Sequence, residues 1–393
     1  MMLSMDRRAF VQALLATATL PASASAAEVR DLKGMLEPIR VQNEFPALAA
    51  AVMKQGTLLA SGVTGVRVRG TTIAAEAGDR FHLGSDTKAM TATLAGMLID
   101  AGKLDWGATI GDVLGAKIPG INPALAGVTL EQLLSHSGGI PSDTDEIAKL
   151  YFNADAFEYN LPETRLRIIT GIKDHAPVSP PGKEFHYANL GYVIAGAMIE
   201  TAAGVPWEEL LVTRLFTPLK LTSAGIGPQA TTGHIDAPVG HKVNDDGSVT
   251  PMYWGPAADV PPAIGPAGAA HMSILDFATW ADWNAGEGRR GPALVKPETL
   301  ARIHRAHVST GPLPDAKPGT PQEGEYACGW GILAYDWSNG PVLTHNGSNS
   351  MNFARILVDT RADLSIVVCT NFPGAKPQSV SEVITEQLYR TFA

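Results

Sequence analysis

The chain has 393 residues, of which 45% are hydrophobic and 18% charged, so a sizeable core is possible and wholesale disorder is excluded. With 30 Lys and Arg against 39 Asp and Glu, the net charge of -9 argues against nucleic acid as the main partner. The 2 Cys exclude a disulfide scaffold and a four-cysteine zinc module, and the length suits one large domain or two interlocked ones.

Residues 1–26 are typical of a secretory signal peptide. Arg7 and Arg8 precede a short apolar run, which is followed by a small-residue cleavage step. The paired arginines resemble a twin-arginine export signal, although Asp6 stands where Ser or Thr is more usual. The run is too short to span a bilayer, and nothing later in the sequence reaches the required length. We expect a mature chain that begins near Ala27 and resides in the periplasm or outside the cell.

Hydrophobic spacing predicts the remaining elements in chain order. We expect a hairpin over 47–63 that turns at Gln55-Gly56, and a helix over 86–100 that is buried all round. Other helices are predicted over 190–203, 206–216, 274–285, 297–306 and 378–392, strands over 329–337, 341–344, 352–358 and 364–371, and Gly/Pro-rich loops through 243–268.

Strands at both ends of the chain around a helical middle indicate an α/β (α+β) fold. We expect an antiparallel sheet lobe of about 40–104 and 271–393, with an inserted helical lobe of about 105–270. Active sites often lie between two such lobes. Cys328 and Cys369 fall in predicted strands, where two buried free thiols are favoured over a disulfide.

Several catalytic signatures are absent from the sequence. No serine lies in G-x-S-x-G, and there is no H-E-x-x-H, Walker loop or dinucleotide fingerprint. His304 and His307 are spaced for one helix face, but without a third ligand they favour a solvated face, so no metal site is predicted.

Ser85 and Lys88 form an S-x-x-K arrangement at the predicted start of the 86–100 helix. One turn of helix separates them, so they share a face. A serine hydroxyl needs a neighbour that takes its proton, and a lysine in a dry cleft can accept one. The alternative is a serine that caps the helix and a lysine on the surface.

Two further elements could supply polar groups to the same site. Tyr187 and Asn189 point the same way in an extended segment, where a tyrosine near a lysine would ionise more easily and an amide could hold a substrate. The alternative is a core tyrosine and a helix-capping Asn189.

The second of these elements lies at the end of a predicted strand, where His345 and Gly347 face the same way. The glycine would let a substrate approach the backbone, and the Ser348 N–H could donate to an oxyanion. The alternative is a hairpin turn with a surface histidine.

In this order the elements resemble the serine β-lactamase and penicillin-binding-protein superfamily, on its class C β-lactamase and family VIII esterase side. The resemblance covers about residues 40–392. It includes Leu133-Leu134-Ser135-His136-Ser137-Gly138-Gly139-Ile140-Pro141, Gly265-Pro266-Ala267-Gly268-Ala269 and Gly329-Trp330-Gly331.

The resemblance implies an antiparallel sheet flanked by helices, with the site beside a helical lobe and no metal or organic cofactor. It implies Ser85 as nucleophile, and Lys88 and Tyr187 as general base and acid. Asn189 would then bind substrate, and His345 to Ser348, with Gly347, would form the third motif and its oxyanion donor.

The third motif departs from the Lys-Thr-Gly usual in class C β-lactamases. His345-Asn346-Gly347 resembles the esterase, D-aminopeptidase and D-alanyl-D-alanine peptidase branches, and histidine supplies only conditional charge. We therefore expect a serine hydrolase that cleaves an ester or amide of a small molecule. The alternatives are a true β-lactamase or D-alanyl-D-alanine carboxypeptidase and, less favoured, an idle binding protein. The sequence leaves the oligomeric state open.

Overall fold

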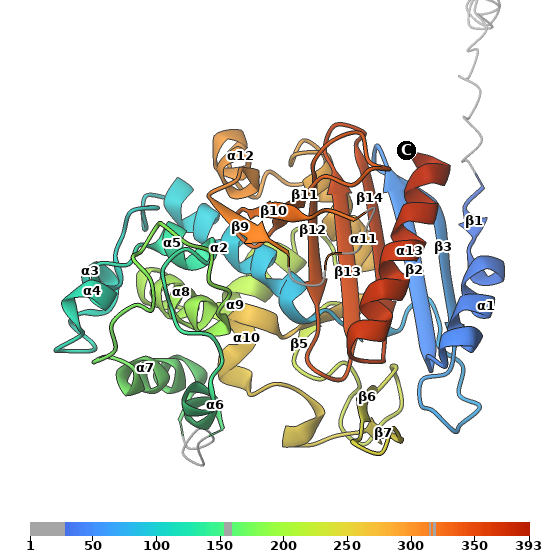
Figure 1. The fold of residues 1–393 in the computed structure, drawn as a ribbon, viewed down its shortest axis with the longest axis horizontal. Coiled ribbons are helices and arrows are strands. Elements are labelled where there is room, and N and C mark those ends of the chain that lie inside the picture. Colours follow the sequence, from blue (N-terminus) through green and yellow to red (C-terminus); the bar gives the residue numbers. More distant parts are fainter. Residues whose placement is uncertain (1–27, 153–158, 314–315, 317–319) are drawn as a thin grey trace, which may run out of the picture.

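The computed structural model of the protein describes residues 28–152, 159–313, 316 and 320–393, and the predicted signal peptide of 1–26 lies outside these residues. Over the described residues, one side of the molecule is a nine-stranded sheet that is antiparallel except where β1 joins β3 (Figure 1). Its strands in spatial order are β1 (Arg30–Asp31), β3 (Thr57–Gly65), β2 (Ala47–Lys54), β14 (Leu364–Thr370), β13 (Phe353–Asp359), β12 (Val342–Gly347), β11 (Gly331–Leu333), β10 (Glu323–Tyr326) and β9 (Val308–Pro312).

Helices cover both faces of the central strands. Alternation along β2 sends Ala49 into the larger core, which also holds residues of α11 (Ile274–Ala285). Its neighbour Leu48 enters a second cluster with α1 (Lys33–Asn43) and α13 (Ala375–Phe392). Because both faces are buried, β2 and β14 are apolar along most of their length.

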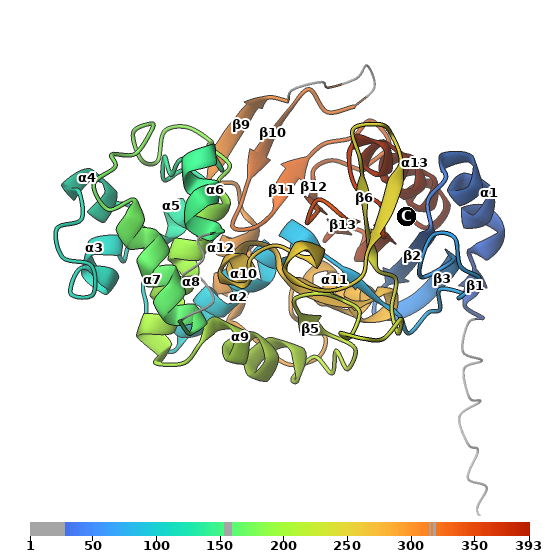
Figure 2. The same ribbon diagram turned by 90° about the horizontal axis from the view of Figure 1, so that it is seen from below.

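A group of helices lies on the other side of the molecule. They are α3 (Ile110–Leu114), α4 (Pro123–Ala126), α5 (Leu130–Leu134), α6 (Asp145–Tyr151), α7 (Leu161–Gly171), α8 (Asn189–Ala203) and α9 (Trp207–Leu210). In Figure 2, α2 (Thr87–Asp100) lies between this group and the sheet, and it contacts α8, α10 (Gly265–Gly268) and α12 (Pro297–His304). All its residues from Thr87 to Gly96 are buried, which confirms the predicted burial for most of this helix.

Shorter strands complete the fold. β4 (Arg80–His82) and β5 (Gly225–Ile226) pair with the two edges of β8 (Ala270–Ser273), and β6 (Gly240–Val243) forms a hairpin with β7 (Val249–Met252). The strand β4 leads directly into a 3-10 turn, η1 (Gly84–Asp86), and then into α2. Ser85 therefore lies on a short turn between two elements, β4 and α2, that both pack into the core.

Most predicted elements are confirmed. The β2–β3 turn lies at Gln55-Gly56, where both residues have the positive φ values (51° and 78°) that a tight hairpin requires. The predicted strand at 329–337 is wrong in extent, because only Gly331–Leu333 pairs with β12. The segment 243–268 was expected to be loop, but it contains β7, two 3-10 turns and α10.

The structure also decides the predictions about the two cysteines and about His304 and His307. Cys328 and Cys369 are free and buried, as expected. His304 and His307 do not form a solvated face: His304 bonds Asn284, and His307 bonds the Arg302 carbonyl. Within the described residues, no helix combines the length and the apolar character needed to cross a membrane.

Candidate active site

Ser85 and Lys88 meet at the start of α2. The Lys88 ammonium donates to Ser85 Oγ at 3.1 Å, to Asn189 Oδ1 at 2.7 Å and to the Ala267 carbonyl at 2.8 Å. Lys88 is fully buried and Ser85 is half-buried, so the alternative of a surface lysine is wrong. The serine hydroxyl thus lies at the edge of the protein interior with a buried amine beneath it.

The environment of Lys88 shifts the pKa of its amine close to neutral pH. Burial lowers the pKa of Lys88 to about 7, although the negative charges of Asp143 and Asp86 oppose this shift. The oxygens of Asn189 and Ala267 can only accept, so the two hydrogens of a neutral amine would face them. Its lone pair would then face Ser85 Oγ.

Tyr187 reaches the same hydroxyl from the segment before α8. Its phenol donates to Ser85 Oγ at 2.9 Å, and its ring centroid lies 4.8 Å from Lys88 Nζ. The prediction that Tyr187 ionises more easily near a lysine is wrong. Burial raises the pKa of Tyr187 above its usual value and outweighs the Ser85 hydrogen bond, so the phenol keeps its proton.

Asn189 is the first residue of α8 and does not cap it, so the capping alternative is wrong. Its Oδ1 accepts from Lys88, and its Nδ2 donates to Asp143 Oδ2 at 2.5 Å. The amide therefore links the buried amine to an exposed carboxylate. Its binding of substrate stays a prediction.

The third motif touches the Ser85 turn backbone to backbone. A Cβ on Gly347 would lie 1.8 Å from the Leu83 carbonyl oxygen, and one on Gly84 would lie 2.2 Å from Ser348 N. Glycine at 347 therefore admits Leu83, a protein group, where the sequence suggested substrate. The contact brings the backbone N–H of Ser348 beside the turn that carries Ser85.

The Ser348 side chain belongs to its own loop. Its hydroxyl donates to the Asn352 carbonyl at 2.7 Å and accepts from the Ser350 N–H at 3.0 Å. The turn is therefore held by its own side chain, which leaves the main chain of Ser348 as the part that lies against Gly84.

His345 is buried, so the alternative of a surface histidine is wrong. Its Nδ1 lies 2.9 Å from the Asn346 carbonyl, which can only accept, so Nδ1 carries the proton. Nε2 then accepts from the Tyr326 hydroxyl at 2.9 Å. Burial and the nearby Lys88 charge lower the pKa of His345 to about 3, so this residue offers no fixed cation at neutral pH.

Sequence reasoning missed two groups next to these residues. His136 packs its ring 4.2 Å from that of Tyr187 and accepts from the Ala188 N–H. Asp86 is buried with both carboxylate oxygens unbonded and lies 3.5 Å from His345 Nδ1, and burial raises the pKa of Asp86 well above its usual value. His136 belongs to a segment that the resemblance had marked without a role; nothing in the pattern marked Asp86.

No group of three or more His, Cys, Asp or Glu side chains suited to a metal ion occurs within the part of the chain that the structure describes.

Comparison with known proteins agrees with this architecture. The family model described as Beta-lactamase matches residues 18–388. The chain belongs to the Beta-lactamase family. Within the family it is similar to penicillin-binding protein 4 of Amycolatopsis lactamdurans, with 28% identity over 346 residues that cover 85% of this chain and 83% of that protein. It is also similar to an unguisins hydrolase of Aspergillus campestris, with 26% identity over 67% of this chain and 48% of the relative, about half its length.

Solved structures confirm the fold. The octameric penicillin-binding protein homologue from Pyrococcus abyssi superposes with a TM-score of 0.73 at 22% identity, over 91% of this chain and 76% of that one. A D-stereospecific amidohydrolase from Streptomyces superposes with a TM-score of 0.67 at 20% identity, over 88% and 95%. Family and fold together place the chain among hydrolases of the β-lactamase fold.

Proposed function

We propose that the protein is a serine hydrolase that cleaves an ester or amide bond of a small molecule through an acyl-enzyme. The observation that carries the proposal is the convergence on Ser85 Oγ of the Lys88 amine at 3.1 Å and the Tyr187 phenol at 2.9 Å. A hydroxyl between a base and an acid is the arrangement that nucleophilic catalysis needs. Ser85 is the nucleophile in this proposal.

Acylation follows from the protonation states. Neutral Lys88 takes the hydroxyl proton as Ser85 Oγ attacks the carbonyl carbon, and the backbone N–H groups of Ser85 and Ser348 receive the developing oxyanion. When the tetrahedral intermediate collapses, Tyr187 gives its proton to the leaving alcohol or amine. Protonated Lys88 then returns a proton to Tyr187, so both side chains end neutral and an acyl-Ser85 ester remains.

Deacylation repeats these steps with water in place of Ser85. Lys88 takes a proton from water as its oxygen attacks the acyl carbon, Tyr187 gives its proton to Ser85 Oγ as it leaves, and protonated Lys88 then restores the Tyr187 proton. The products are a carboxylic acid and the free enzyme. No metal or organic cofactor takes part in these steps.

The state of His345 supports an ester or amide over a β-lactam. A β-lactam carries a carboxylate that a fixed cation would bind, and buried, neutral His345 does not supply one. The names of the penicillin-binding relatives support the second candidate, a true β-lactamase or a D-alanyl-D-alanine carboxypeptidase. A panel of p-nitrophenyl esters, nitrocefin and a D-Ala-D-Ala peptide, with intact-mass detection of the adduct, separates the two.

Ser85→Ala tests the nucleophile. We expect the variant to fold, to lose labelling by a fluorophosphonate probe and to lose at least about 10³-fold in kcat. Ser223→Ala is the matched control, because Ser223 bonds Asp276 away from the Ser85 contacts and should keep both labelling and turnover. Labelling of Ser85→Ala at another serine with turnover intact would show that the assignment is wrong.

A further inference from the structure

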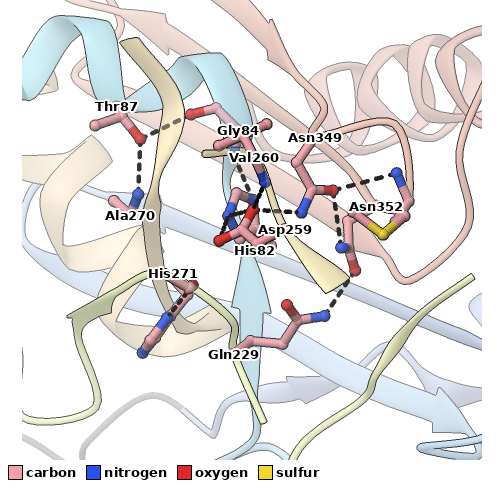
Figure 3. A network of polar contacts seen from close by, with 12 residues as sticks. His82, Gly84, Thr87, Gln229, Asp259, Val260, Ala270, His271, Asn349 and Asn352 are labelled. Carbon is pink, nitrogen blue, oxygen red and sulfur yellow. Dashed lines mark hydrogen bonds and ion pairs between the residues drawn. The ribbon is translucent and has the colours of Figure 1, made fainter. Parts of the chain in front are cut away.

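A second buried polar cluster lies beside the Ser85 turn, and the mechanism does not use it (Figure 3). Its centre is Asp259, which is 9% exposed and lies between two short 3-10 turns. His82 Nε2 lies 3.0 Å and 3.2 Å from its two carboxylate oxygens. The Asn349 amide donates to Oδ1 at 2.9 Å, and the Val260 N–H donates to the same oxygen at 2.7 Å.

One arm of the cluster reaches the residue before the nucleophile. The Gly84 N–H donates to His82 Nδ1 at 3.1 Å, so Nδ1 accepts and the other ring nitrogen, Nε2, carries the proton that faces Asp259. The same turn is held from its other side, where Thr87 Oγ1 donates to the Gly84 carbonyl and accepts from the Ala270 N–H. Both backbone polar groups of Gly84, the residue before Ser85, are thus fixed by side chains that do not contact the Ser85 hydroxyl.

The other arm reaches the loop that follows the third motif. Asn349 Oδ1 accepts from the Met351 N–H at 3.2 Å and from Asn352 Nδ2 at 2.9 Å. The Asn352 carbonyl in turn accepts from the Ser348 hydroxyl, and Gln229 donates to the Asn352 side chain. Asp259 therefore holds the amide around which the loop of 348–352 is folded.

The charge of Asp259 is stabilised in place. Burial alone would raise its pKa, but the hydrogen bonds from His82, the Asn349 amide and the Val260 N–H hold the pKa of Asp259 below its usual value. A buried carboxylate with three donors is costly to remove, because its loss leaves all three donors without their acceptor.

We propose that Asp259 is a positioning residue for the oxyanion hole: through His82 and Asn349 it holds the turn of Ser85 and the turn of Ser348 in register. This inference rests on the proposed function, since the two backbone N–H groups matter only if an oxyanion forms at Ser85. The turns already touch at Gly84 and Ser348, and a shift of about 1 Å between them would misalign one donor at a cost of about 10²-fold in rate.

The first test is Asp259→Asn, which keeps the shape and removes the charge. We expect kcat for a p-nitrophenyl ester to fall about 10- to 100-fold while KM changes less than about threefold. Sulfur is a poorer acceptor than oxygen, so the matching thionoester depends less on the N–H donors and should lose much less. A merely structural role would lower the rates on both substrates alike.

The second test acts at the other end of the link. Asn349→Ala removes the amide that Asp259 holds and leaves the carboxylate its His82 and Val260 donors. We expect the ester kcat to fall while the thionoester loses much less. If Asp259→Asn does not fold, a folded Asn349→Ala with an unchanged ester kcat would overturn the proposal.

Asp276→Asn is the control for loss of a structural carboxylate, since Asp276 accepts from Ser223 at the start of α11. It should lower the melting temperature without changing the ratio of ester to thionoester rates. An unchanged ester kcat in Asp259→Asn, or equal losses on both substrates, would overturn the inference. Ser85→Ala is measured alongside: retained turnover there would contradict the proposed function itself, whereas an inactive Ser85→Ala with a fully active Asp259→Asn would contradict only the role of Asp259.

Discussion

Two polar clusters adjoin the turn of Ser85, and they differ in how far other interactions offset the cost of burial. The first comprises Ser85, Lys88 and Tyr187, and its members contact the serine hydroxyl. The second comprises His82, Asp259 and Asn349, and the hydrogen bonds of its members run to one another and to the turns beside Ser85 instead of to the hydroxyl.

The difference between the clusters lies in what compensates burial. Desolvation dominates at Lys88 and lowers its pKa to about 7, which makes its proton exchangeable at neutral pH. At Asp259 the donors outweigh desolvation, so the pKa of the carboxyl is lowered and its charge is stable. A group whose desolvation is only weakly offset can exchange its proton near neutral pH, which proton transfer needs. A group whose desolvation is fully offset keeps its charge and can hold its neighbours in place.

Among the variants that test this difference between the clusters, the largest change in kcat is expected at Lys88. Lys88→Met removes the proposed base and should lower kcat by about 10³- to 10⁴-fold, with Ser85 still present to be measured by intact-mass trapping. If Lys88→Met acylates at the wild-type rate, the first cluster is not a proton-transfer site.

Tyr187→Phe is expected to have the next largest effect. It removes the proton donor to the leaving group and should lower kcat by about 10²-fold. The loss should be smaller for p-nitrophenyl esters than for alkyl esters, because nitrophenolate leaves without needing a proton. Equal losses on the two leaving groups, measured as kcat for each, would contradict the role of general acid.

The pH dependence of kcat/KM distinguishes the clusters directly. Lys88 must be neutral to act as base, so activity should rise with pH through about 7 and fall about tenfold for each unit below it. Asn349→Ala, in the second cluster, should lower the plateau without moving this limb. A limb displaced in Asn349→Ala would show that the clusters are not separate in function.

The smallest effect is expected at Asp143. Its negative charge favours the charged form of Lys88, so Asp143→Asn should lower the pKa of Lys88 and move the acid limb to lower pH, by less than about one unit. Asp143 is exposed, so the shift should shrink as salt is raised. A limb that moves to higher pH in this variant would reverse the proposed electrostatics.

Local pattern was sufficient to predict much of the fold. The turn residues Gln55-Gly56 predict the hairpin, and the spacing of apolar residues predicts the helix α11; both signals come from residues close together in the sequence. Such spacing was insufficient at 243–268, where β7 and α10 are short and their glycines and prolines are typical of loops.

The site was predicted unevenly for the same reason. Ser85 and Lys88 stand one helical turn apart, so their meeting needs only a helix. The partners His82, Asp259 and Asn349 come from three distant segments without a motif, and no spacing indicates that they meet. The ionisation of Tyr187 was predicted in the wrong direction, because its burial cannot be read from its neighbours in the sequence.

The amino-acid sequence by itself predicted most of the elements and the candidate catalytic side chains Ser85, Lys88 and Tyr187, since helix, turn and strand preferences act over a few residues. Only the tertiary structure decided the protonation states and the positions of the backbone donors. Both depend on how much water the fold removes from Lys88 and Tyr187 and on how closely Leu83 and Gly84 approach Gly347 and Ser348. Desolvation and backbone contact are properties of segments brought together from far along the chain.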